Sequence, residues 1–155
     1  MPFRHTLGVQ VDRPASVLPQ TVVSPGTPYF TVAGGKVLIT GLVGEIVTAN
    51  VGGVVNANWF HNAAVGTDVN ICAATALGAL VIGDILVVTG LLTDAMLPAA
   101  HASSAHFGGA TALGVKGFIV TAGALGVITN ASVAGEWIWT LWYIPLTAGA
   151  LVVPA

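Results

Sequence analysis

The chain has 155 residues, which is the size of one ordinary domain. Charged residues make up only 6% of it, against about 25% in a typical soluble domain, whereas 55% of the residues are hydrophobic. This composition excludes intrinsic disorder, and four basic residues scattered along the chain are too few to bind nucleic acid electrostatically. With so few charges, we expect much of the surface to be covered by lipid or by other protein.

Lipid is the less favoured cover. The uncharged stretches that are long enough to span a bilayer contain glycine, proline and polar residues, and no basic cluster flanks them. The N-terminal residues include Pro2 and Arg4 and have no apolar segment typical of a secretory signal. We therefore expect no membrane partner, folding in a reducing cytoplasm, and a surface covered by the subunits of a tight assembly.

The N-terminal segment is rich in proline. Five of the eight prolines lie in the first 28 residues. Because proline fixes φ and lacks an amide donor, residues 1–28 are predicted to form an extended arm that lies largely outside any sheet and docks on neighbouring subunits. A short strand is predicted only over Leu7–Val11. The contact residues expected in this arm are Pro14, Pro19, Pro25 and Pro28.

Residues 29–155 are predicted to form a single β domain. Val, Ile and Thr are abundant, and Gly, Asn and Asp interrupt the apolar runs every eight to twelve residues. Short strands at this spacing predict an all-β fold, either a β-sandwich or a barrel, of the jelly-roll type. A short helix is an alternative for Ile71–Leu80. The predicted strands are Tyr29–Ala33, Lys36–Thr40, Glu45–Ala49, Val54–Trp59, Asp68–Ala73, Ile85–Gly90, Lys116–Ala122, Gly126–Ala131 and Trp137–Ile144.

The segment 94–113 has neither a helical nor a strand period. At about 20 residues it is long for a loop in a compact domain, which predicts an extended loop that contacts a neighbour. Its His101 and His106 have the side chains of a metal site, with Asp94 or His61 as further ligands. Since the spacing of these residues selects no known metal geometry, we predict no metal and no cofactor.

The sequence contains no catalytic motif, and we predict that the protein is not an enzyme. A Gly-x-Ser-x-Gly elbow is absent. Asp68 and Asp84 are interpreted as turn residues that precede strands. Cys72 is the only cysteine, so it is interpreted as a small buried apolar residue.

The C-terminal run 137–146 is apolar on both faces of a strand. Large side chains occupy its odd positions, and Ile138, Trp142 and Ile144 occupy its even positions. One face is expected to serve the core, and the other needs a second cover, which predicts a subunit interface. The interface residues expected here are Trp137, Trp139, Trp142 and Tyr143.

A carbohydrate-binding interpretation uses the same aromatic residues. Exposed tryptophan rings stack on sugar rings, and neighbouring asparagines bind hydroxyl groups. Under this alternative Trp59 and the tryptophans of 137–142 are the ring platforms. The amide residues beside them are Asn56, Asn58 and Asn62.

Two segments carry a resemblance. The run Trp139–Ala150 (WTLWYIPLTAGA) and the run Val37–Val47 (VLITGLVGEIV) resemble small virion proteins of tailed bacteriophages that are rich in Val, Ala, Gly and Thr. The resemblance implies a β-rich particle component, such as a capsid decoration or cement protein that forms trimers. It implies no catalytic residue.

We therefore predict a non-enzymatic structural protein that decorates or cements a virus capsid through subunit contacts. Its partners are the major capsid protein or other virion subunits, and it forms a homo-oligomer, with a trimer favoured. Its location is the virion, assembled in the host cytoplasm. The alternatives are a tail-fibre, spike or carbohydrate-binding module and, less favoured, a membrane-inserted protein.

Overall fold

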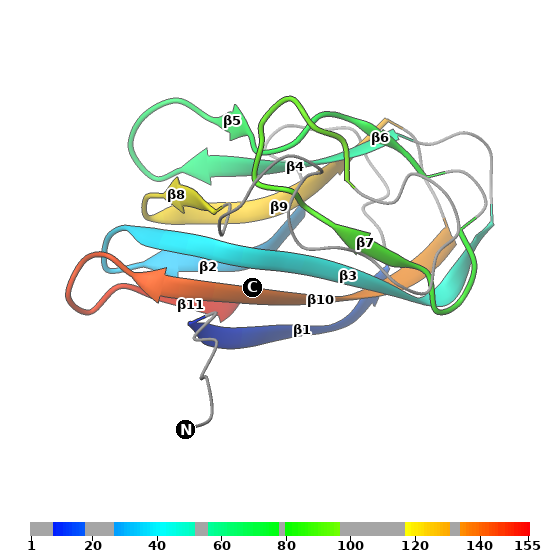
Figure 1. Ribbon diagram of the computed structural model, residues 1–155, viewed down its shortest axis with the longest axis horizontal. Helices are drawn as coiled ribbons and strands as arrows, with labels where there is room; N and C mark the ends of the chain where they lie inside the picture. The colour runs from blue at the N-terminus through cyan, green and yellow to red at the C-terminus, as the bar shows by residue number, and fades with distance from the viewer. Residues whose placement is uncertain (1–7, 18–26, 52–55, 78–79, 97–116, 131–133) are drawn as a thin grey trace, which may run out of the picture.

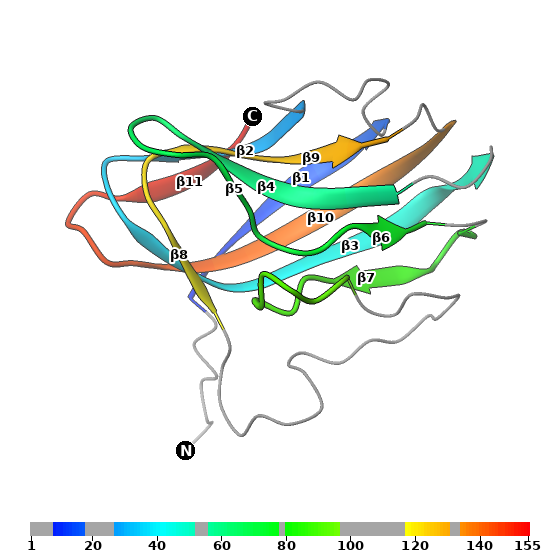
Figure 2. The same cartoon turned by 90° about the horizontal axis from the view of Figure 1, so that it is seen from above.

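The chain is all β. The structure, a computed structural model, describes residues 8–17, 27–51, 56–77, 80–96, 117–130 and 134–155. Within these ranges every element is a strand, and the strands form two antiparallel sheets that pack face to face (Figures 1 and 2). The predicted all-β sandwich is thereby confirmed. The alternative helix at Ile71–Leu80 is not formed in its described residues, which contain β6 (Thr75–Ala76).

Sheet A has the long strands of the molecule. Its order is β1 (Val9–Val17), β10 (Ala134–Pro145), β3 (Val37–Val51) and β7 (Ile85–Val87), and β8 (Phe118–Val120) pairs with the opposite end of β3. Sheet B has shorter strands. Its order is β11 (Leu151–Pro154), β2 (Thr27–Ala33), β9 (Gly123–Thr129), β4 (Asn56–Ala63) and β5 (Val69–Asn70), and β6 also pairs with β4.

The connectivity is that of a jelly roll. If β6, β8 and β11 are set aside, eight strands remain in chain order, from β1 to β10. In that order sheet A reads first, eighth, third, sixth, and sheet B reads second, seventh, fourth, fifth. The chain thus crosses between the sheets at almost every connection, as in the two nested Greek keys of a jelly roll. The additional strand β11 continues sheet B beyond β2.

One long strand replaces two predicted ones. Lys36–Thr40 and Glu45–Ala49 were expected to be separate strands because glycines lie between them, but β3 runs through without a break. Gly44 lies directly opposite Trp139 on β10. A Cβ atom at Gly44 would lie 2.8 Å from carbons of the Trp139 ring. This glycine therefore makes room for an indole inside the sheet instead of ending the strand.

The remaining predicted strands in sheets A and B are present with shifted ends. The strand predicted at 54–59 becomes β4, and the one predicted at 126–131 becomes β9, which begins three residues earlier. The strands predicted at 68–73, 85–90 and 116–122 shorten to β5, β7 and β8. Turns and irregular backbone take up the rest of those segments in the described residues.

Part of the predicted arm belongs to sheet A. The strand expected at Leu7–Val11 extends over Val9–Val17 and pairs with β10, so this part of the segment does not lie outside the sheet. Proline is tolerated here because β1 is an edge strand, where a missing amide donor costs no ladder bond on the open side. Residues 1–7 and 18–26, with Pro19 and Pro25, lie outside the described residues.

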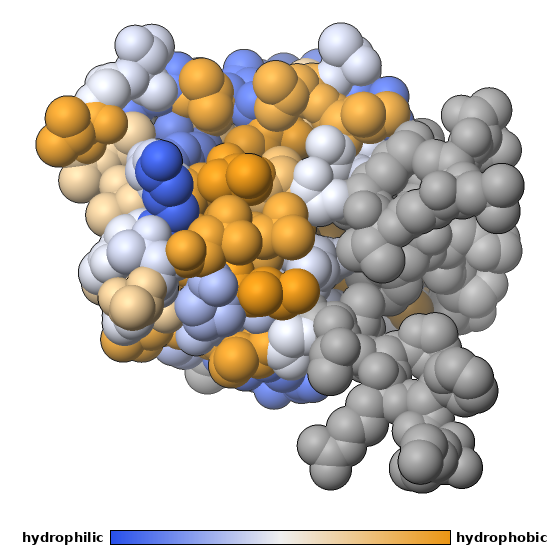
Figure 3. All heavy atoms as spheres, turned by 60° about the vertical axis from the view of Figure 1, so that its left-hand side comes forward, coloured by the Kyte–Doolittle hydropathy of each residue, from blue (hydrophilic) through white to orange (hydrophobic). Residues whose placement is uncertain are grey.

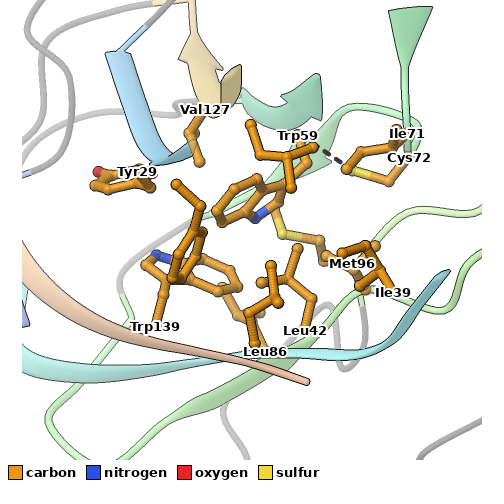
Figure 4. Packing of buried hydrophobic residues seen from close by; sticks show 14 of the residues in the cluster. Tyr29, Ile39, Leu42, Trp59, Ile71, Cys72, Leu86, Met96, Val127 and Trp139 are labelled. Atoms are coloured by element: carbon orange, nitrogen blue, oxygen red, sulfur yellow. Dashed lines mark hydrogen bonds between the residues drawn. The ribbon is translucent and has the colours of Figure 1, made fainter. Parts of the chain in front are cut away.

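The space between the sheets is filled by aromatic and aliphatic side chains. Trp59 of sheet B and Trp139 of sheet A meet at its centre, with ring centroids 4.8 Å apart and planes at 80° (Figure 4). Tyr29 packs on Trp59 at 5.6 Å, and Trp137 stacks on Trp139 at 5.6 Å. Such edge and offset contacts are the favoured geometries of aromatic pairs.

Candidate interaction surfaces

The inner face of β10 is buried within the chain. Trp137 and Trp139 have no exposed surface, and Tyr143 has only 5%. In this fold they have no surface to offer to a partner, which corrects their assignment to a subunit interface. The physical reason is the alternation of the strand, because all three occupy odd positions and face sheet B. Trp142, at an even position, remains partly exposed.

The burial of the tryptophans also removes most of the expected sugar platforms. Trp59 is fully buried in the core, together with Trp137 and Trp139. Of the asparagines, Asn58 uses its side-chain amide to donate a 2.9 Å hydrogen bond to Asn70. Trp142 is thus the only one of the four tryptophans that is not fully buried.

Aliphatic side chains form a row across the outer face of sheet A. Leu38 of β3 lies opposite Ile144 of β10 on one side and opposite Ile119 of β8 on the other. Ile119 is 63% exposed and Ile144 is 38% exposed. Figure 3, turned toward this end of the molecule, shows hydrophobic atoms gathered into a continuous patch. We call the three residues the aliphatic row. The sequence pointed to Ile144 through its even position, but not to the other two.

Two tight turns flank β7 and expose further aliphatic residues. In the first turn the amide of Asp84 donates to the carbonyl of Val81, and Gly83 has φ of +88°. The Asp84 carboxylate accepts a 2.8 Å bond from the Val81 amide, which confirms its interpretation as a turn residue. Ile82 at the tip is 69% exposed. In the second turn Leu92 is likewise exposed, at 58%.

Asp68 and His61 both lie in the β4–β5 hairpin. Asp68 accepts a 3.2 Å bond from the amide of Ala63, as its interpretation as a turn residue predicts. His61 is buried, and its Nε2 lies 3.1 Å from the carbonyl oxygen of Thr121. Burial lowers the pKa of His61, and the Thr121 contact and the charge of Asp68 oppose this shift. The imidazole is therefore held in its neutral form at neutral pH.

Cys72 is buried, as its apolar interpretation predicts. Its Sγ accepts a 3.2 Å hydrogen bond from the Trp59 amide. Desolvation raises the pKa of this thiol to about 11, and the Trp59 contact partly offsets the rise. Such a thiol is a poor nucleophile at neutral pH. Cys72 thus serves the packing of the core.

The predicted metal ligands are not brought together within the described ranges. His61 lies in the β4–β5 region, whereas Asp94 closes the second turn near β7 and accepts a 3.1 Å bond from Thr89. His101 and His106 lie outside the described residues. Among the residues that the structure describes, no three His, Cys, Asp or Glu side chains form a group that could hold a metal ion.

The described residues include no helix with the length and hydropathy of a membrane span. Comparison of the chain with protein-family models, with curated proteins and with solved structures finds no match.

Proposed function

We propose that the chain is a non-enzymatic structural protein of a virus particle, which decorates or cements the capsid through subunit contacts. The observation that carries the proposal is a jelly-roll sandwich that buries its large aromatic residues and leaves aliphatic side chains on its surface. Jelly rolls recur in viral capsid proteins, and also in lectins and cupins. The fold alone therefore does not decide between these roles.

The surface favours the role of a capsid protein over that of a lectin or a cupin. The chain has ten charged residues in 155, and its exposed residues include Ile119 and Ile144 of the aliphatic row and the two turn tips. Apolar side chains in such number are typical of surfaces that other proteins cover. In a particle the partners are the shell protein and further copies of this chain, and the trimer implied by the phage resemblance is one arrangement of such copies.

The main alternative is a tail-fibre, spike or other carbohydrate-binding module. It is favoured by one observation, the partial exposure of Trp142. A single ring offers a smaller stacking surface than the set of tryptophans expected from the sequence. Binding of a glycan at Trp142 would quench the fluorescence of one of the four tryptophans.

The test is mass spectrometry of particles purified by density gradient from the source of the sequence, with the unbound protein fraction as the control. We expect peptides of this chain in the particle band, in a fixed ratio to the shell protein. Removal of the chain in a deletion strain is expected to leave shells that break at lower temperature, because a ligand of the assembled shell stabilises it. Particles without the chain, together with Trp142 quenching by glycans, would favour the alternative.

A further inference from the structure

Among the described residues, strand β1 is an open edge of sheet A. It has nine residues and pairs along one side with β10. Along its other side no strand of the described ranges is paired with it. At the neighbouring edge of sheet B the additional strand β11 covers β2, and it has only four residues (Figure 1). Long open edges are templates for pairing with another chain.

The direction of the main-chain groups on β1 follows from the pairing of its neighbours. In an antiparallel sheet the N–H and C=O of one residue point to the same side, and consecutive residues alternate. Val88 directly follows β7, which pairs with β3 on the side opposite β10. The amide of Val88 donates to the carbonyl of Leu42 at 3.0 Å, so the main-chain groups of Leu42 face β7 and not β10. Leu141, opposite Leu42, therefore directs its groups toward Val11.

It follows that Val11 is bound to β10, whereas Gln10 and Asp12 present their amide and carbonyl groups to the open side. Their side chains lie on the outer face and are exposed. Within one chain, the side-chain amide nitrogen of Gln10 lies 3.0 and 3.1 Å from the two carboxylate oxygens of Asp12. Val11 points inward against the core, and Val9 remains 48% exposed.

We propose that two copies of the chain pair through β1, antiparallel and across a two-fold axis at Val11. Gln10 of each copy then lies opposite Asp12 of the other, and their outward amide and carbonyl groups exchange hydrogen bonds on both sides of the axis. The two Val11 side chains meet on the inner face and join the cores of the two sandwiches. Sheet A becomes continuous through the dimer.

Two neighbouring registers are disfavoured by the residues that they bring together. An axis at Asp12 places two carboxylates opposite each other and sets Gln10 against Pro14, which has no amide donor. An axis at Gln10 sets Asp12 against Gly8, which has no side chain to pair with it. The register at Val11 is the one in which each outward polar residue meets a complementary partner. This self-complementarity is why the occupant is a second copy.

The proposed function includes association between copies of this chain, and the β1 pairing specifies the contact. In that respect the β1 pairing rests on the proposed function. A proline at position 10 removes the outward main-chain donor and the side-chain amide that contacts Asp12, but no bond to β10, because the main-chain amide of Gln10 does not face β10. For the variant Gln10→Pro we expect the native mass to fall from two chains to one, with unchanged circular dichroism. The matched control Gln10→Ala keeps the amide and is expected to remain dimeric.

A cysteine scan tests the register without relying on disruption. At the axis the two Val11 residues form a non-hydrogen-bonded pair with Cβ atoms about 4.5 Å apart, which a disulfide can bridge. The two Val9 residues are about 13 Å apart along the strands, because four positions at about 3.3 Å separate them. Under mild oxidant we expect Val11→Cys to form a covalent dimer and Val9→Cys not to, although Val9 is the more exposed. The wild-type chain controls for Cys72.

Each outcome has a distinct meaning. Cross-linking at position 9 but not at 11 overturns the register, and an unchanged dimer or trimer of Gln10→Pro overturns β1 as the contact. In the first case β1 still associates in another register, and in the second another surface associates, so the proposed function stands in both. A wild-type chain that stays monomeric at all concentrations overturns the dimer, whereas particle mass spectrometry decides the virion role independently.

Discussion

The two faces of β10 use similar side chains for different purposes. On the inner face Trp139 is fully buried and contacts Trp59 of the opposite sheet. On the outer face Trp142 and Ile144 remain partly exposed. The contrast shows that tryptophan content alone says nothing of binding, because alternation along one strand assigns each ring to the core or to the surface.

The inner face is also the more constrained one. Trp139 lies on Gly44, where no side chain other than hydrogen fits. On the outer face Trp142 lies opposite Gly41 of the same strand β3, and no ring there is locked between two sheets. We therefore expect substitutions on the inner face to change folding stability, and substitutions on the outer face to change association.

The largest effect is expected for Trp139→Ala. Removal of a fully buried indole leaves a cavity between the sheets and is expected to lower the free energy of unfolding by about 3–5 kcal/mol. For the matched variant Trp142→Ala we expect about 1 kcal/mol. Urea unfolding followed by circular dichroism measures both. Equal losses for the two variants would contradict the division between the faces.

The next effect is expected for Gly44→Ala. The added methyl group would overlap the Trp139 ring, and relief of this overlap is expected to cost about 1–3 kcal/mol. The contact itself is tested by a double-mutant cycle. In the background Trp139→Leu the cost of Gly44→Ala is expected to shrink, and an unchanged cost would show that the indole is not the cause.

A smaller effect concerns pH. The pKa of His61 is lower in the folded chain than in the unfolded one. Between these two pKa values the unfolded chain therefore binds more protons than the folded chain. The free energy of unfolding is therefore expected to decline as the pH falls below about 6.5, the usual pKa of histidine. The variant His61→Gln removes this group. A decline of the same size in that variant would assign the pH dependence to other groups.

The last prediction concerns the reactivity of Cys72. In the native chain we expect a thiol reagent to modify this residue only slowly. With a pKa near 11 and a buried position, the thiol exposes far less thiolate than an unfolded cysteine. Reaction with a thiol reagent at pH 8 is expected to be at least about a hundredfold slower in buffer than in denaturant. Equal rates would contradict the buried position.

Sequence reasoning predicted local patterns well and long-range pairing poorly. The alternation in 137–146 identified the two faces of β10, and the Gly83–Asp84 pair identified a turn. It divided β3 at its glycines, because the indole that fills the space over Gly44 comes from a strand about 90 positions later. Proline content likewise concealed β1, since its partner β10 is even more distant in sequence.

The position of the exposed apolar residues was not predicted. Low charge led us to expect a cover of other subunits, which stays a prediction. The aliphatic row combines residues of three strands that only the fold brings together. The open edge of β1 has no sequence signature at all, because it depends on which strand of a sheet comes last.

The most direct measurement is the native mass of the wild-type chain, by light scattering in buffer without detergent. We predict twice the 15.5 kDa of one chain, or an even multiple of it, because the open edge of β1 pairs with a second copy. A mass of 15.5 kDa at every concentration would contradict the central claim that copies of this chain pair through β1.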